Sequence, residues 1–301
     1  MARRSREGYR RGVRGRLAAI LMASGTLAGC SSPVTVATFN IRYFPEPSTD
    51  PSRVAQTIAD LDASVIAVQE IRDALRMGAV LEEASRIDGR DYHLLLGPCG
   101  GAGERITTGV VYDAAQWTVV EHLGYPDLRS DGRCVRQPGT LAVLQDQERH
   151  RLAVLSVHLP ALPHRFDERR EQWNQVLARM DEIERRHPGA PVLALGDFNS
   201  TGFRGEPAEE RPFVEEAVAR AGYALPTADL SCTEYWRPPN EPESYWPSVL
   251  DHGVVAGGRF GEAEVRGMCE RLRCQPTEAD AMDPDFAAVS DHCPVVLRGT
   301  L

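Results

Sequence analysis

Lysine is absent from the 301-residue sequence, so all 34 basic side chains are arginines. Enzymes that form a lysine Schiff base, and phosphate sites built on a P-loop lysine, are therefore excluded. We interpret this absence as a compositional bias and not as a functional signal.

Long hydrophobic runs, internal repeats and low-complexity tracts are also missing. No apolar run in the sequence reaches the roughly 18 residues that a transmembrane helix needs. The composition is 42% hydrophobic and 26% charged, with 26 Gly and 21 Pro, which is typical of a folded globular protein. Disordered, collagen-like and coiled-coil classes are thereby excluded.

Acidic residues outnumber basic residues outside the N-terminus. The whole chain carries a formal charge of −9, but seven arginines lie within the first 16 residues, and residues 30–301 carry −15. An acidic body repels phosphate backbones, so it disfavours a tight, non-specific DNA binder. A nuclease that makes only brief contact through a local cationic groove or a bound metal remains compatible with this charge.

The N-terminus has the pattern of an export signal. The seven arginines are followed by a 13-residue apolar stretch, Leu17–Gly29, which is too short to span a bilayer comfortably. Leu27-Ala28-Gly29-Cys30 resembles a bacterial lipobox, and Ser31 favours sorting to the outer membrane. We expect a signal peptide over residues 1–29, a mature domain over residues 30–301, and lipid on Cys30.

This interpretation predicts an exported lipoprotein that is anchored in the periplasm, at the outer membrane or on the cell surface. Each acyl methylene buried in the membrane contributes about 0.8 kcal/mol, so two or three chains on Cys30 would form a stable anchor. The alternative is a plain secretory signal followed by a chance cysteine. We expect the mature protein to be a monomer.

Six cysteines remain after Cys30, and an even number in an exported chain predicts disulfides. Cys99 and Cys134 are the favoured pair, because they flank the segment around Trp117. The alternative is a zinc site at Cys269 and Cys274, but these two lack a second close pair. The six residues are Cys99, Cys134, Cys232, Cys269, Cys274 and Cys293.

Short apolar runs alternate with segments of helical periodicity, which indicates an α/β fold of sheets flanked by helices. The predicted strands are Val34–Phe39, Val65–Val68, His93–Leu96, Gly109–Tyr112, Trp117–Val120, Thr140–Leu144, Leu152–Val157, Val192–Leu195, Val249–Val255 and Pro294–Leu297. The predicted helices are Arg53–Leu61, Asp73–Ile87, Phe166–Arg186 and Phe213–Ala221. Five prolines predict a long ordered loop over Pro226–Pro247.

Polar residues stand at the ends of several predicted strands, where a buried sheet would otherwise continue with apolar residues. Each one alone is more often a turn former. Together, carboxylates, amides and imidazoles at strand ends converge in space, and such ligands suit a hard cation such as Mg²⁺. These residues are Asn40, Glu70, His158, Asp197, Asn199, Asp251, Asp291 and His292.

Two of these segments are specific motifs, GDFN at residues 196–199 and SDHCPV at residues 290–295, with QE at 69–70 and LDH at 250–252. In this order they resemble the endonuclease/exonuclease/phosphatase superfamily of metal-dependent phosphodiesterases and phosphatases, including deoxyribonuclease I. The resemblance covers the mature chain. It implies a four-layer α/β sandwich, with two packed mixed β-sheets and helices outside.

The resemblance also implies the residues that bind metal and phosphate. Glu70 matches the principal metal ligand, with Asn40 in the same shell and Asp291 beside the metal, which is Mg²⁺ or else Mn²⁺ or Ca²⁺. Asn199 and Arg136 match residues that contact phosphate.

Four further residues match the catalytic groups of the superfamily. His292 matches the active-site histidine that activates water, and Asp251 matches the carboxylate that orients it. Asp197 matches a residue that orients water and is a rival for water activation. His158 is suited to protonating the leaving oxygen, and Glu104 is its expected acidic partner.

The resemblance implies that the protein hydrolyses a phosphodiester, and a nuclease-like activity is the first expectation. Arg72 matches a residue that reaches the DNA minor groove, although a solvated arginine at a helix start is the ordinary alternative. Residues 100–108 lack the aromatic that stacks on DNA in deoxyribonuclease I, which puts DNA as the substrate in question. The pairs Tyr235-Trp236 and Tyr245-Trp246 are suited to stacking on a base or head group, or to packing a loop.

Two other functions remain open. The chain could hydrolyse a phospholipid, sphingomyelin or a small phosphate ester with the same residues. It could also keep the fold as a binding module without catalysis, which the presence of every key residue disfavours.

Overall fold

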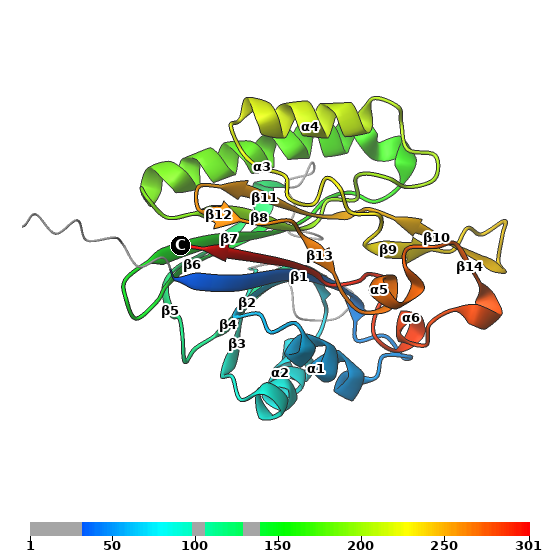
Figure 1. Cartoon of the computed structure of the whole chain (residues 1–301), viewed down its shortest axis with the longest axis horizontal. Helices are drawn as coiled ribbons and strands as arrows, with labels where there is room; N and C mark the ends of the chain where they lie inside the picture. Colours follow the sequence, from blue (N-terminus) through cyan, green and yellow to red (C-terminus); the bar gives the residue numbers. More distant parts are fainter. Residues whose placement is uncertain (1–31, 98–105, 129–138) are drawn as a thin grey trace, which may run out of the picture. The chain divides into compact units, whose positions relative to one another are not determined.

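Two mixed β-sheets pack face to face at the centre of the structure, with helices on both outer sides (Figure 1). The computed structural model describes residues 32–97, 106–128 and 139–301. The arrangement is the expected α/β sandwich. Cys30, Cys99, Glu104, Cys134 and Arg136 lie outside the described residues, so the predictions on them stay predictions.

The first sheet has seven strands in the order β12-β15-β1-β2-β4-β3, with β13 beside β15. Its strands are β1 (Pro33–Phe44), β2 (Val65–Ile71), β3 (Tyr92–Leu96), β4 (Thr107–Asp113), β12 (Arg259–Phe260), β13 (Glu264–Val265) and β15 (Val295–Thr300). β1 and β2 run parallel, with Asn40 opposite Gln69, so the polar ends of both strands lie at the same edge.

The second sheet has five strands in the order β11-β8-β7-β6-β5. Its strands are β5 (Thr118–Tyr125), β6 (Gly139–Gln145), β7 (Arg151–His158), β8 (Val192–Asp197) and β11 (Asp251–Ala256). β7 and β8 are parallel with His158 opposite Asp197, and antiparallel β11 places Asp251 opposite Asp197. Strand register alone therefore brings three of the predicted site residues into one row.

Four long helices cover the outer faces of the two sheets (Figure 1). α1 (Pro51–Asp60) and α2 (Ala74–Asp88) pack on the seven-stranded sheet, and α3 (Phe166–Arg186) and α4 (Glu210–Arg220) pack on the five-stranded sheet. The carboxylates of Asp50 and Asp73 accept backbone N–H bonds at the starts of α1 and α2, which satisfies donors that lack a partner within the helix. A separate core fills the space between the sheets.

The remaining helices are short. They are α5 (Met268–Leu272), α6 (Asp285–Ala288) and the 3₁₀ turns η1 (Pro126–Leu128), η2 (Pro163–Arg165) and η3 (Ala279–Ala281). None of the helices in the described part of the chain is long and apolar enough to cross a membrane.

A third, small sheet corrects the expectation of a long loop over Pro226–Pro247. β9 (Glu234–Trp236) and β10 (Ser244–Ser248) pair antiparallel, and β14 (Thr277–Glu278) extends the sheet. Strands of three and five residues are too short to give a periodic signal, and the prolines around them favoured a loop.

Two disulfides lie beside this small sheet, Cys232–Cys274 and Cys269–Cys293. They confirm the prediction of disulfide bonds for four of the six cysteines that follow Cys30. Because Cys269 and Cys274 belong to different disulfides, the zinc alternative is wrong.

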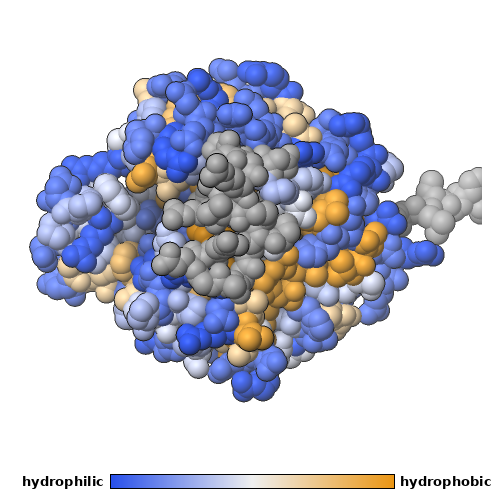
Figure 2. All heavy atoms as spheres, turned by 180° about the vertical axis from the view of Figure 1, so that it is seen from behind, coloured by the Kyte–Doolittle hydropathy of each residue, from blue (hydrophilic) through white to orange (hydrophobic). Residues whose placement is uncertain are grey.

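Most of the surface seen from behind is hydrophilic, and hydrophobic residues gather mainly to one side of it (Figure 2). This agrees with the 26% of charged residues in the sequence.

Candidate active site

A cleft of about 220 Å³ opens at the edge where β2 of one sheet meets β7 and β8 of the other. Its walls bring together residues that are far apart in the chain. Of the predicted site residues, the cleft is lined by Glu70, His158, Asp197, Asn199 and His292. Asn40 and Asp251 are buried directly behind them.

Asp197 is the centre of the hydrogen-bond network. Its Oδ2 accepts from Asn40 Nδ2 at 3.0 Å and lies 3.3 Å from His158 Nε2, while Oδ1 accepts the Asn199 backbone N–H at 2.8 Å. Burial alone would raise the pKa of Asp197, but the imidazoles of His158 and His292 lower it below its usual value. Asp197 is thus a carboxylate fixed between two histidines.

The residue before Asp197 must be a glycine, because β7 lies too close to Gly196 for a side chain. Its φ is +157°, and an added Cβ would lie 2.0 Å from the carbonyl oxygen of Val157 on β7. No side chain fits this approach of the two strands. The glycine of the GDFN motif therefore allows β8 to carry Asp197 up to His158.

Glu70 stands at the end of β2 with a left-handed φ of +65°, which turns its side chain into the site. Oε2 accepts the Tyr43 backbone N–H at 2.7 Å, and Oε1 lies 3.4 Å from Asn40 Nδ2 and 3.8 Å from His158 Nε2. Burial raises the pKa of Glu70, and the nearby His158 opposes this shift. A cation beside Glu70 would stabilise its charged form.

His292 and Asp251 form a buried pair. The Nδ1 of His292 lies 2.8 Å from Asp251 Oδ2, so the carboxylate fixes Nδ1 as the protonated nitrogen and leaves Nε2 directed toward Asp197, 3.8 Å away. Burial alone would lower the pKa of His292, but Asp251 and Asp197 raise it well above its usual value. This geometry is that of a histidine oriented by a carboxylate for proton transfer.

The described residues contain two groups whose donor atoms all lie within 4.8 Å of one another at this site, Glu70-His158-Asp197 and Asp197-Asp251-His292. The first group fits a divalent cation, because two buried carboxylates face each other with only imidazole and amide donors between them. Asn40 contributes through its NH₂ group, which donates to both carboxylates.

Two predicted residues lie at the margin of the site. Asp291 is partly exposed, with Oδ2 3.8 Å from Arg42 Nη1, and it does not belong to either candidate ligand group of the described residues. The guanidinium of Arg72 lies 5.1 Å from the centre of the Tyr43 ring. The predicted roles of both residues, in metal binding and in groove contact, stay predictions.

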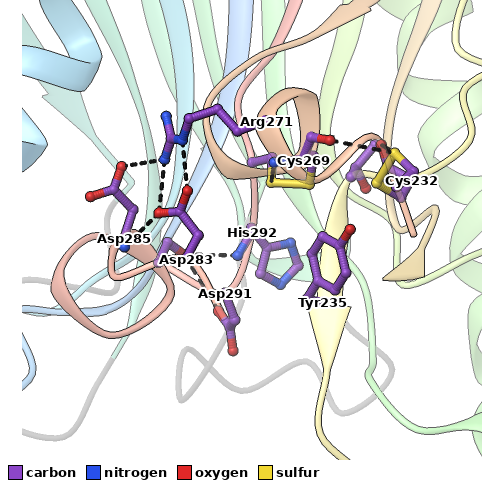
Figure 3. The surroundings of a disulfide bond; sticks show 12 residues. Cys232, Tyr235, Cys269, Arg271, Asp283, Asp285, Asp291 and His292 are labelled. Atoms are coloured by element: carbon purple, nitrogen blue, oxygen red, sulfur yellow. Dashed lines mark hydrogen bonds and ion pairs between the residues drawn. A yellow bond between two sulfur atoms is a disulfide. The ribbon is translucent and has the colours of Figure 1, made fainter. Parts of the chain in front are cut away.

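The second disulfide holds the segment that carries His292 (Figure 3). Cys293 follows His292 directly and is bonded to Cys269 of α5. On the same helix, Arg271 donates to Asp283 and Asp285, which lie just before this segment. The segment that carries His292 is thus fixed by a covalent bond to α5 and by ion pairs.

Glu234 is a cleft residue that the sequence analysis did not identify. It lies on β9, is 5% exposed, and lines the cleft opposite Ser248. Burial raises the pKa of Glu234 well above its usual value. The sequence signal that could have identified it is a glutamate within the short aromatic segment TEYW. An acidic residue among aromatic residues must be either buried or at the edge of a sheet.

The model of the Endonuclease/Exonuclease/phosphatase family matches residues 37–292 of the chain. The chain belongs to this family. Members of the endonuclease/exonuclease/phosphatase family hydrolyse phosphate esters and typically depend on a divalent metal. The acidic and histidine groups described above agree with this property. No curated protein matches the chain.

Solved structures of the family share the fold of the chain at low sequence identity. TDP2 of D. rerio, complexed with single strand DNA product, is 15% identical with a TM-score of 0.64, over 90% of this chain and 100% of that chain. A family protein of Bacteroides thetaiotaomicron is 16% identical with a TM-score of 0.61, over 90% and 98%. The mannosyl-6-phosphatase Bt3783 of Bacteroides thetaiotaomicron is 17% identical with a TM-score of 0.60, over 88% and 98%.

Proposed function

We propose that the protein hydrolyses phosphodiester bonds with the help of a divalent metal, Mg²⁺ in the first instance. The observation that carries this proposal is the His292-Asp251 pair, whose free Nε2 faces the same cleft as Glu70 and Asp197. A hydrolase of phosphate esters needs both a proton acceptor and a site for a cation, and the two are adjacent here.

Glu70 and Asp197 would hold the metal, with Asn40 keeping the two carboxylates in place and Asp291 beside them. When bound, the ion neutralises charge on the phosphate and lowers the pKa of a water molecule. Asn199, at the end of the GDFN motif, and Arg136 are proposed to bind the phosphate itself.

Proton transfer is assigned to the two histidines. In its neutral form, His292 accepts the proton of the attacking water at Nε2, and Asp251 stabilises the imidazolium that results. Asp197 is the weaker base, because hydrogen bonds and neighbouring histidines lower its pKa. His158, buried beside Asp197, protonates the leaving oxygen.

Nuclease activity is the first candidate, since TDP2, which shares the fold, has been solved with a DNA product. Hydrolysis of small phosphate esters is the second, since a mannosyl-6-phosphatase also shares the fold and the cleft has mostly apolar walls. A phospholipid or sphingomyelin diester would react by the same chemistry.

The test is hydrolysis by the purified chain lacking residues 1–30, in Mg²⁺, Mn²⁺ or EDTA, with plasmid DNA, RNA, sphingomyelin and bis-p-nitrophenyl phosphate. Glu70→Gln should raise the metal concentration needed for activity. His292→Ala should reduce the rate roughly 10² to 10⁴-fold while metal affinity changes little. Glu216→Gln, on the exposed face of α4, is the matched control. Full activity in EDTA, or full turnover of every ester in His292→Ala, would overturn this mechanism, whereas no hydrolysis of any ester would favour the binding module.

We also propose that lipid on Cys30 anchors the exported protein to a membrane. Cys30→Ser should remove the lipid, and the variant should move from the detergent phase to the aqueous phase on partitioning. Equal partitioning of Cys30→Ser and the wild type would count against the anchor.

A further inference from the structure

The β9-β10 hairpin presents one polar and aromatic face to the cleft. Side chains alternate along a strand, and directly paired residues share a face. Glu234 pairs with Ser248 and Trp236 pairs with Trp246, so these four residues point to the same side. Tyr235, on the other side, packs among the disulfide cysteines.

Glu234 is a buried carboxyl that is only partly satisfied. It is hydrogen-bonded to Ser248, but its Oε2 atom has no hydrogen-bond partner among the described residues. A buried polar atom without a partner is costly, and a hydroxyl from a bound molecule would remove that cost. A carboxyl group can accept hydrogen bonds from such a hydroxyl at its oxygens.

Apolar surface surrounds this carboxyl in the cleft. Trp236, which is 42% exposed, stands two residues beyond Glu234 on β9, and Leu162 and Phe203 are part of the same lining. A pocket with mainly apolar walls and a few polar groups is typical of a small-molecule site. A saturated ring with C–H groups on its face and hydroxyl groups at its edge matches an indole beside a carboxyl and a serine.

The described lining of the cleft offers few cations to a polyanion. Arg204 is the single arginine among its described lining residues, and Glu241 accepts two hydrogen bonds from it at 2.7 Å. The same guanidinium lies 4.7 Å from the centre of the Trp246 ring. Strong binding of a nucleic-acid strand needs several uncommitted cations along the backbone.

We propose that this cleft binds the hydroxyl-bearing, sugar-like alcohol of a phosphate ester, with its ring against Trp236 and its hydroxyls bonded to Glu234 and Ser248. The proposal rests on the proposed function, because the phosphate of such an ester would lie at His292 and Asp197, which line the same cleft. Glu234 and Trp236 would then determine which ester is hydrolysed.

The test is calorimetric binding of two monoesters to the purified full-length protein in detergent, with EDTA present so that no ligand is hydrolysed. Glucose 6-phosphate and cyclohexylmethyl phosphate both place a six-membered ring next to the phosphate, but only the first has hydroxyls. The wild type should bind glucose 6-phosphate at least about tenfold more tightly, or about 1.4 kcal/mol. Glu234→Leu should remove most of this difference, and Glu234→Gln should keep part of it.

Trp236→Ala is the second variant, because a half-exposed side chain can be removed without disturbing the core. It should weaken the binding of glucose 6-phosphate about fivefold or more. The control Glu216→Gln should bind this ester as tightly as the wild type does. Equal affinity of the wild type for both esters, tighter binding of thymidine 5′-phosphate than of glucose 6-phosphate, or no binding at all would overturn the proposal. So would an unchanged preference in Glu234→Leu together with an unchanged affinity in Trp236→Ala.

Failure of this inference is distinguishable from failure of the proposed function. Hydrolysis of bis-p-nitrophenyl phosphate in Mg²⁺, measured on the same protein, reports on the catalytic groups and does not require a sugar. Activity without hydroxyl preference overturns only the inference, and hydroxyl preference without activity overturns only the function.

Discussion

At the scale of single residues, the site consists of carboxylates that fix histidines in defined orientations. Asp251 holds the Nδ1 side of His292, and Asp197 lies between His292 and His158. Each carboxylate is buried, so its charge acts with little screening by water. Residues arranged in this way work as a unit.

His292 and Asp251 should therefore show non-additive effects on catalysis. We expect Asp251→Asn to reduce kcat in the same direction as His292→Ala, and the double variant to be little slower than the slower single variant. Steady-state kinetics on bis-p-nitrophenyl phosphate measure the three rates. Losses that multiply in the double variant would show that the two residues act separately.

His252, a buried histidine outside the candidate ligand groups of the described residues, should make stability depend on pH. Burial lowers the pKa of His252 to about 4, and its Nδ1 lies 3.0 Å from the Thr227 hydroxyl while its ring packs near Trp173 and Phe198. Below about pH 6.5 the unfolded chain binds a proton here that the folded chain does not bind. The stability provided by neutral His252 is therefore present above about pH 6.5 and is lost as the pH falls toward 4.

Between pH 7.5 and pH 5, this residue alone should reduce the free energy of unfolding by about 2 kcal/mol. Urea unfolding at both pH values should show a smaller difference for His252→Gln than for the wild type. His93→Gln, at an exposed position, is the control. The same pH dependence in His252→Gln and the wild type would contradict the prediction.

At the scale of secondary-structure elements, the site depends on how closely β8 approaches β7. Gly196→Ala would place a Cβ 2.0 Å from the Val157 carbonyl oxygen, so the strands must move apart. We expect a loss of at least about 3 kcal/mol in unfolding free energy, with little remaining activity. Thermal unfolding and hydrolysis rates measure the two effects.

Gly189→Ala is the matched control for Gly196→Ala. Gly189 also has a positive φ of +85°, but a Cβ there meets nothing within 4 Å. We expect a loss of only about 1 kcal/mol there, with activity kept. If Gly196→Ala is no worse than Gly189→Ala, the close strand approach is not essential.

The long elements could be predicted from the sequence because their patterns extend over many residues. α3 spans Phe166–Arg186, as predicted, and every predicted strand corresponds to an observed one with ends shifted by a few residues. The β9-β10 hairpin was missed because its strands are short and lie between prolines. Glu234 was missed because only the pairing of β9 with β10 shows that it turns toward the cleft.

The placement of the site residues could be predicted for a different reason. The motif residues stand at strand ends, and the pairing of the strands determines which of them lie next to one another. The row His158-Asp197-Asp251 follows from strand register. The sequence gives no measure of side-chain distances, so the amide donation of Asn40 to two carboxylates emerged from the structure.

At the scale of the whole molecule, the two disulfides connect the C-terminal segments to the active site. Each disulfide is expected to contribute about 2 to 4 kcal/mol to stability. Because Cys293 adjoins His292, loss of Cys269–Cys293 should also reduce activity, whereas Cys232–Cys274 ends two residues from Glu234 and should mainly affect substrate binding.

Two double variants, each with both cysteines of one disulfide replaced by alanine, separate these two effects. Cys269→Ala with Cys293→Ala should lower Tm and kcat, and Cys232→Ala with Cys274→Ala should lower Tm and raise KM. Both pairs should respond less to a reductant than the wild type does. Unchanged kcat in the first pair would show that the protein fold alone holds His292.

The pairing of the first strand with the last has a consequence for biosynthesis. β1 carries Asn40, β15 begins three residues after His292, and the two strands pair antiparallel, so an early and a late segment of the described chain lie together at the site. Protein synthesis proceeds from the N-terminus, and a growing chain holds Asn40 and Glu70 long before it holds His292. On the proposed mechanism, a growing chain is therefore unable to cleave phosphate esters before His292 is made.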